Sequence, residues 1–170
     1  IDMHSHADGN ILEDLDAENS TRQGLTTVVV GQDGESEYPL ADFLGKLEKS
    51  PPALNVASMV GHGTIRHLAM DPKNQIREAT PEEIAKMKQL LAEELKAGPF
   101  GLSSGLEYDP GHFATTAEVI DLAKMAGEQG GFYISHVRDE GNHVFDSYDE
   151  IIKIGKGGKL PVEITHIKMG

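Results

Sequence analysis

The chain has 170 residues, of which 38% are hydrophobic and 25% are charged, a composition that is ordinary for a globular protein. Its 28 acidic residues outnumber its 15 basic residues, and the formal net charge is −13. This charge argues against a nucleic-acid or anionic-membrane partner, because binding phosphates requires a basic surface. The sequence contains no cysteine, which excludes a disulfide scaffold and any metal site with thiolate ligands. No apolar run approaches the roughly 20 residues that a membrane-spanning helix needs.

Short apolar runs alternate with longer helical patterns along the whole chain. The apolar runs predict six strands, at residues 1–4, 26–31, 54–60, 100–106, 132–136 and 160–166, because each run is bounded by glycine, proline or polar residues. Helical patterns at 14–22, 40–49 and 148–154 predict helices between these strands. Two further helices are predicted from capping boxes, Thr80 with Glu83 and Thr115 with Glu118, in which each side chain bonds the other residue's backbone N–H.

About six β-α units of roughly 30 residues each follow one another, which implies a parallel sheet. A doubly wound sheet and a TIM barrel both fit this pattern. A complete barrel has eight units and typically ~250 residues, so six units would form about three quarters of one. Periodicity alone does not choose between the two folds.

Histidines follow three of the predicted strands. His4 and His6 lie two residues apart at the end of the first strand, so both imidazoles point to the same face. His136 and His166 follow the fifth and sixth strands. Each of these histidines taken alone is more typical of an ordinary surface or hydrogen-bonded residue. Together they favour a divalent transition metal, because the carboxyl ends of parallel strands share one edge of a sheet and neutral imidazoles suit such ions.

Two carboxylates are candidate partners for these histidines. Glu107 follows the fourth strand, where it is either a solvated loop residue or a carboxylate that bridges two metal ions. Asp33 follows the second strand, where Asp33-Gly34 is equally typical of a plain turn.

Three further residues are candidates for substrate contact. His62 lies between Gly61 and Gly63, and glycines let the backbone approach a ligand closely; the alternative is a tight loop with an exposed histidine. Arg66 and Arg138 are each suited to a bidentate contact with a substrate carboxylate. The alternative for each arginine is an ion pair with a neighbouring acid.

The histidine pattern together with the acidic residue after the fourth strand resembles the amidohydrolase superfamily, whose members are metal-dependent TIM-barrel hydrolases. The sequence motifs are most similar to those of the N-acyl-D-amino-acid deacylases, also called D-aminoacylases. The similar stretches occur in the family's order along the whole chain, at residues 1–8, 23–31, 61–66, 101–111, 135–140 and 165–168.

The resemblance implies an α/β fold that is an incomplete (β/α)8 TIM barrel of about six βα units. Residues 1–170 are then a single catalytic-barrel fragment with strands 1 to 6, lacking strands 7 and 8 and any flanking β domain. It also lacks the Asp after strand 8 that serves the family as general acid and base, so the fragment itself is expected to be inactive.

The resemblance also implies the roles of the site residues. His4 and His6 would hold a first metal ion and His136 and His166 a second, with one or two zinc ions expected. Glu107 is favoured as the bridging ligand, because its alignment falls on the family's bridging position after strand 4. Asp33 is the second choice, at a position where some members have a bridging cysteine. His62, Tyr108 or Tyr133 would stabilise the oxyanion, and Arg66 or Arg138 would bind the substrate carboxylate.

The implied reaction is hydrolysis of the amide bond of small-molecule N-acyl-D-amino acids to a carboxylic acid and a D-amino acid. One alternative keeps the fold but changes the substrate to a cyclic amide, as in dihydroorotase or hydantoinase. A second alternative is an inactive metal-binding fragment, and a third is a doubly wound protein with coincidental histidines.

Overall fold

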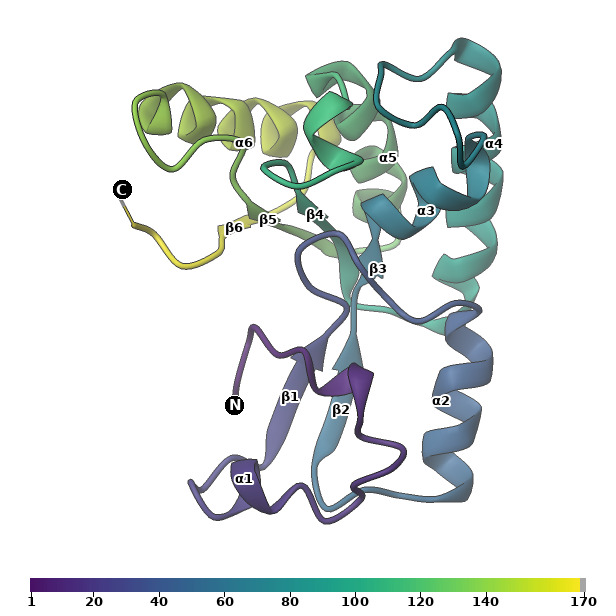
Figure 1. Cartoon of the computed structure of the whole chain (residues 1–170), viewed down its shortest axis with the longest axis vertical. Helices are drawn as coiled ribbons and strands as arrows, with labels where there is room; N and C mark the ends of the chain where they lie inside the picture. Colours follow the sequence, from purple (N-terminus) through teal and green to yellow (C-terminus); the bar gives the residue numbers. More distant parts are fainter. Residues whose placement is uncertain (169–170) are drawn as a thin grey trace.

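The computed structural model describes residues 1–168. It is an α/β structure with six strands in these residues: β1 (Thr27–Val30), β2 (Asn55–Ser58), β3 (Val60–Gly61), β4 (Gly101–Gly105), β5 (Phe132–His136) and β6 (Val162–Ile164). Helices α1 (Glu18–Thr21), α2 (Leu40–Lys49), α3 (His62–Ala69), α4 (Pro81–Glu94), α5 (Thr116–Glu128) and α6 (Val144–Gly158) lie between them (Figure 1). Short 3₁₀ turns, η1 (Ala7–Gly9), η2 (Leu95–Ala97) and η3 (Gly111–Phe113), complete the elements.

All strand pairs are parallel, and the two strands of each pair are consecutive in the chain. β1 pairs with β2, and β3, β4, β5 and β6 form a four-stranded sheet in that order. The two sheets are joined at Met59, because Met59 N donates to Val30 O while Ser58 O accepts from Phe100 N, each at 2.9 Å. This order does not reverse anywhere in residues 1–168, whereas a doubly wound sheet has a reversal point.

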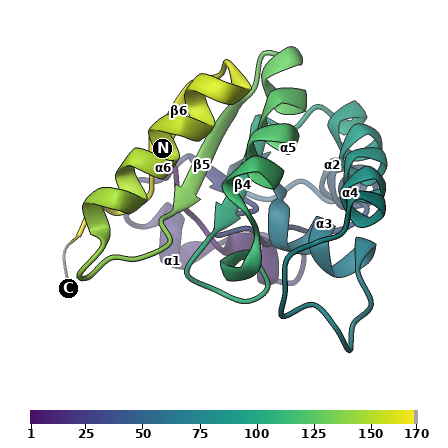
Figure 2. The same ribbon diagram turned by 90° about the horizontal axis from the view of Figure 1, so that it is seen from above.

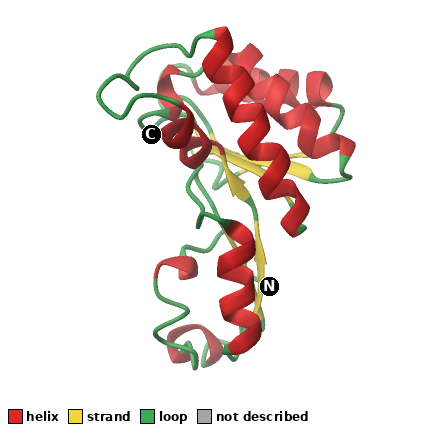
Figure 3. Cartoon of the chain, turned by 90° about the vertical axis from the view of Figure 1, so that its right-hand side faces the viewer, coloured by secondary structure: helices red, strands yellow, loops and turns green. Residues whose placement is uncertain are grey.

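Consecutive helices pack against one another beside the sheet. α3 contacts α4, α4 contacts α5, and α5 contacts α6, and Figure 2 shows α6, α5 and α4 following one another across the four-stranded sheet. Figure 3 shows α2 alongside β1 and β2, toward the end of the molecule that lies opposite to α5 and α6 (Figure 1). No helix within residues 1–168 has both the length and the hydropathy needed to cross a membrane.

Strands β1, β3, β4 and β5 are largely buried on both faces, as is usual for a parallel sheet. On β1, Val28 and Val30 belong to the main core with the helices, whereas Val29 packs with Met59 and Ile134 in a second, smaller cluster. Successive residues of a strand point to opposite faces, so this second cluster lies on the face away from the main core.

The capping boxes have different outcomes. The Thr80 hydroxyl accepts from Glu83 N at 3.3 Å and the Glu83 carboxylate accepts from Thr80 N at 2.8 Å, which confirms the box at the start of α4. Thr115 caps α5 by accepting from Glu118 N at 3.2 Å. The Glu118 carboxylate does not complete that second box, because it bonds His62 and Arg66 instead.

Three other predictions need correction. Residues 1–4 do not form a strand, and only Asp2 makes a β-bridge, to Val28. Residues 62–66, expected to form a loop, begin helix α3, in which Ile65 and Ala69 are buried against the core. The last helix runs from Val144 to Gly158, well beyond the predicted 148–154.

Candidate metal centre

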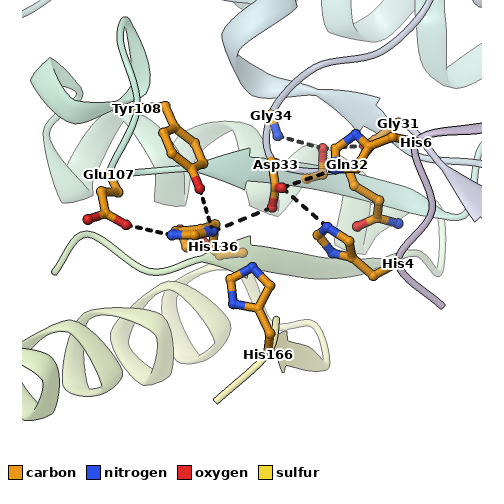
Figure 4. A network of polar contacts seen from close by, with 12 residues as sticks. His4, His6, Gly31, Gln32, Asp33, Gly34, Glu107, Tyr108, His136 and His166 are labelled. Atoms are coloured by element: carbon orange, nitrogen blue, oxygen red, sulfur yellow. Dashed lines mark hydrogen bonds and ion pairs between the residues drawn. The ribbon is translucent and has the colours of Figure 1, made fainter. Parts of the chain in front are cut away.

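The four predicted histidines come together at the carboxyl ends of the strands (Figure 4). His136 is the last residue of β5, and His166 follows β6 by two residues. His4 and His6 lie in the N-terminal segment, which bonds β1 through Ser5 N and Val29 O at 3.0 Å. Ring centroids are 5.1 Å apart for His4 and His6, 5.4 Å for His4 and His166, and 4.5 Å for His136 and His166.

Asp33 lies between the two pairs of histidines. Its Oδ2 is 3.2 Å from His4 Nε2 and 3.3 Å from His6 Nε2, and its Oδ1 is 3.9 Å from His136 Nδ1. The residue has a φ of 53°, in the left-handed region that aspartate tolerates better than most residues. Asp33 therefore forms both the predicted turn and part of the site.

Neighbouring strands hold the Asp33 turn in place. Ser103 of β4 accepts from Gly34 N at 3.2 Å and donates to Gly31 O at 2.5 Å. The first turn of α3 contributes Thr64 N, which donates to Gly34 O at 3.0 Å. Gly105 of β4 lies so close that an added Cβ would be 2.3 Å from Asp33 O, so only glycine fits there.

Glu107 contacts a single histidine, on the ring edge away from Asp33. Its Oε2 is 2.6 Å from His136 Nε2, whereas His136 Nδ1 faces Asp33. The Glu107 side chain is 44% exposed and that of His136 only 2%. Glu107 thus lies outside the space between the two histidine pairs.

Tyr108 joins the site through its hydroxyl, which is 3.2 Å from His136 Nδ1. Burial, together with the nearby charges of Asp33 and Glu107, raises the pKa of Tyr108 above its ordinary value. A cavity of about 220 Å³ opens beside this tyrosine, and its walls include Asp33 and His6.

Glu140 is a further site residue, to which the sequence analysis gave no role at the metal centre. Its Oε1 lies 3.2 Å from His166 Nδ1 and 3.4 Å from His136 Nε2, and its Oε2 lies 2.9 Å from Lys168 Nζ. Burial favours the neutral carboxyl, but Lys168 and the two histidines hold the pKa of Glu140 below its ordinary value. The sequence signal that could have identified Glu140 was its position four residues after His136, a predicted metal ligand.

The structure does not bring His62 and Arg66 to the centre, contrary to the roles expected for them. Both side chains are fully buried between α3 and α5, where Glu118 accepts from His62 Nε2 at 2.9 Å and from Arg66 NH1 at 2.6 Å. Arg66 also donates to Arg77 O at 2.8 Å. With these contacts, neither side chain faces a substrate.

Arg138 and Tyr133 are likewise engaged elsewhere. Arg138 donates to both oxygens of Glu150, at 2.8 and 2.9 Å, and to Ala114 O at 3.0 Å. The Tyr133 hydroxyl is buried against Ser104, and burial raises the pKa of Tyr133 to about 12. Neither side chain contacts the histidine cluster.

The residues of the centre fit a divalent metal ion. His4, His6 and Asp33 each place one donor atom within 4.8 Å of the others, and so do Asp33, His136 and His166, with Asp33 shared. His4 Nδ1 and Asp33 Oδ1 are buried without a hydrogen-bond partner. Burial lowers the pKa of His4 against the opposing effect of Asp33, which favours the neutral imidazole that binds metals.

Comparison with known proteins gives consistent matches over nearly the whole chain. The chain is 38% identical to a D-aminoacylase and 36% identical to an N-acyl-D-aspartate deacylase, both from Alcaligenes xylosoxydans xylosoxydans, with 99% of the chain aligned in each case. It superposes with a TM-score of 0.91 and 35% identity on a crystal structure of D-aminoacylase, described as defining a novel subset of amidohydrolases. Over 99% of its length, the chain is therefore similar to D-aminoacylases and related N-acyl-D-amino-acid deacylases.

Two other solved structures of this family are informative about metals. One is a D-aminoacylase with a binuclear metal centre, and it superposes with a TM-score of 0.93 at 35% identity. The other is an N-acyl-D-glutamate deacylase from Bordetella bronchiseptica complexed with zinc and a phosphonate inhibitor, with a TM-score of 0.93 at 32% identity. The chain spans 38 to 40% of the length of these relatives. No family model matches the chain.

Proposed function

We propose that this chain is the metal-binding arc of an N-acyl-D-amino-acid deacylase, in which the described strands and helices form consecutive βα units of a (β/α)8 barrel. The chain order of the parallel strands and the packing of α3, α4, α5 and α6 each on the next support a barrel arc. The observation that carries the proposal is Asp33, whose two oxygens face two different pairs of histidines at the carboxyl ends of the strands.

The proposed metal ligands are the four histidines predicted from the sequence together with Asp33. Asp33 takes the bridging position for which the sequence analysis favoured Glu107. His4 and His6 would hold one zinc ion, His136 and His166 a second, and Asp33 would lie between the ions. Asp33 is preferred to Glu107 as the bridging ligand, because Glu107 is near His136 only and on its far edge. Zinc bound there supplies Lewis-acid activation of a water molecule and of the amide carbonyl.

Tyr108 is the residue of this chain that we assign to the substrate. Its hydroxyl lies beside His136 and next to the cavity. A tyrosine phenol is protonated at neutral pH, and the raised pKa of Tyr108 favours this form further. It can therefore donate a hydrogen bond to the oxygen of the amide carbonyl as negative charge develops there.

Proton transfer is expected from outside the matched stretch. The resemblance places the general acid and base, an Asp, after strand 8, and this chain covers about two fifths of its relatives. We therefore expect turnover from a protein that also supplies that Asp.

The test is an assay of such a protein after metal analysis. We expect bound zinc and release of a D-amino acid from an N-acetyl-D-amino acid, with no turnover of dihydroorotate. Asp33→Ala should abolish zinc retention, whereas Glu107→Gln should retain zinc. Turnover of dihydroorotate alone would indicate a cyclic-amide hydrolase instead. Zinc binding without hydrolysis would indicate an inactive metal-binding protein.

A further inference from the structure

We infer that Glu140 is a positioning residue that orients both histidines of the second metal position, His136 and His166. The inference deepens the proposed function and rests on it. It concerns how this part of the centre is held in shape, and Glu140 itself is not placed among the metal ligands.

The Glu140 carboxylate lies close to the imidazole rings of both His136 and His166. Oε1 lies 3.2 Å from His166 Nδ1 and 3.4 Å from His136 Nε2, so one oxygen faces two imidazoles. This oxygen is buried and accepts no hydrogen bond in the structure. A buried carboxylate oxygen without a partner is costly, and a small rotation of either ring provides one.

The contact with Glu140 determines which ring nitrogen of each histidine is left to bind a metal. A metal-binding histidine usually donates its other N–H to a carboxylate, which fixes the tautomer and the ring orientation. A proton on His166 Nδ1 facing Glu140 leaves Nε2 as the ligand. A proton on His136 Nε2, shared between Glu107 and Glu140, leaves Nδ1 facing Asp33 as the ligand.

An ion pair with Lys168 holds Glu140 itself in place. Its second oxygen, Oε2, pairs with Lys168 Nζ at 2.9 Å, and its side chain is only 12% exposed. Lys168 follows His166 by two residues, so the ion pair also ties the segment after β6 to the loop after β5. With Oε2 fixed by the lysine, Oε1 is directed to the histidines.

The experiment is stepwise loading of the metal-free protein with Co²⁺, in the wild type and in Glu140→Ala and Glu140→Gln. Visible absorption and the dissociation constant are recorded for each equivalent. We expect Glu140→Ala to weaken the second equivalent about 10- to 100-fold and to change its spectrum, without affecting the first. Glu140→Gln keeps an acceptor oxygen, so it should recover part of the affinity.

Two further variants serve as controls. Glu163→Gln changes an exposed acid on β6 and should bind cobalt as the wild type does. Lys168→Met leaves Glu140 in place but removes its anchor, and should weaken the second equivalent less than Glu140→Ala. Thermal unfolding followed by circular dichroism identifies any variant that fails to fold, in which case Glu140→Gln and Lys168→Met decide the question.

The outcomes separate the two proposals. If the wild type binds no cobalt, the proposed metal centre fails, and the role of Glu140 fails with it. If the wild type binds two equivalents and the Glu140 and Lys168 variants match its affinities and spectra, only the role of Glu140 is overturned.

Discussion

Replacing Glu118 by alanine is expected to destabilise the protein severely. The Glu118 carboxylate is 1% exposed and is shared by His62 Nε2 at 2.9 Å and Arg66 NH1 at 2.6 Å, both on fully buried side chains. Without it, the buried Arg66 guanidinium retains Arg77 O as its hydrogen-bond acceptor, and the positive charge has no counter-charge.

The size of the effect follows from this geometry. Removing one partner of a buried ion pair costs about 3–5 kcal/mol, because the other charge stays buried without compensation. For a chain of this length, each kcal/mol lowers Tm by roughly 2–4 °C. The expected fall in Tm for Glu118→Ala is therefore about 6 to 20 °C.

The assay is reversible unfolding in urea and by heat, with Glu128→Ala as the matched control on an exposed position of the same helix. The control should stay within about 0.5 kcal/mol of the wild type. A Glu118→Ala protein that is also within about 1 kcal/mol of the wild type would refute the reasoning, because that value is below the range for breaking a buried pair.

The pH dependence gives a second check on Glu118. Burial opposes ionisation, but His62 and Arg66 outweigh it and hold the pKa of Glu118 below its usual value of 4.5. A carboxyl with a lowered folded-state pKa contributes stability that is fully present above its unfolded pKa and is lost as the pH falls through its folded pKa. The difference in unfolding free energy between wild type and Glu118→Ala should therefore narrow as the pH falls below 4.5; a difference that grows in acid would contradict the assignment.

Three other substitutions test separate parts of the structure. Asp33→Asn keeps the side-chain shape but removes the charge facing both histidine pairs, so metal content after desalting should fall for both positions; retention of two ions would contradict the central placement of Asp33. Gly105→Ala places a Cβ 2.3 Å from Asp33 O, so it should lower the free energy of unfolding by about 1–3 kcal/mol and also lower the metal content. A wild-type metal content would show that the Asp33 turn adapts to the added Cβ. Thr80→Ala removes the hydroxyl that accepts from Glu83 N and should cost about 1 kcal/mol in urea unfolding with metal content unchanged; a loss of metal would mean that α4 supports the centre.

Much of the centre was predictable because strand ends in a parallel sheet share one edge. The pattern placed His136 and His166 after consecutive strands, and the structure brings their ring centroids to 4.5 Å. The spacing of His4 and His6 was informative for the same reason, although residues 1–4 form only a single bridge. The convergence of these side chains depends on the parallel direction of the strands, which the alternation of strands and helices indicates.

The contacts across the sequence were not predictable in the same way. Glu118 reads locally as the second half of a capping box with Thr115, but its carboxylate bonds His62 and Arg66, more than 50 residues away. Local pattern cannot show that a tertiary partner competes for a side chain. Helix α3 was missed for a related reason: Gly61 and Gly63 suggested a loop, whereas burial of Ile65 on the core stabilises a helix.

The choice between Glu107 and Asp33 shows the limit of strand-end reasoning. Both residues follow strands, and sequence position alone does not show which side of the histidines each carboxylate lies on. The left-handed turn at Asp33, held by Ser103 and Thr64, directs its carboxylate between the histidine pairs. That direction depends on hydrogen bonds from two other elements.

The donor set of the centre also sets its chemical durability. Its proposed ligands are imidazole nitrogens and carboxylate oxygens, and the chain has no cysteine. Peroxide attacks thiolate ligands, which pass through sulfenic acid to irreversible products, and the proposed ligands contain no sulfur for it to attack. A carboxylate is also a harder ligand than a thiolate, so a site with Asp33 as ligand is expected to accept manganese more readily than a site with a cysteine there would. The proposed donor set is therefore expected to withstand peroxide better than a set that includes a thiolate.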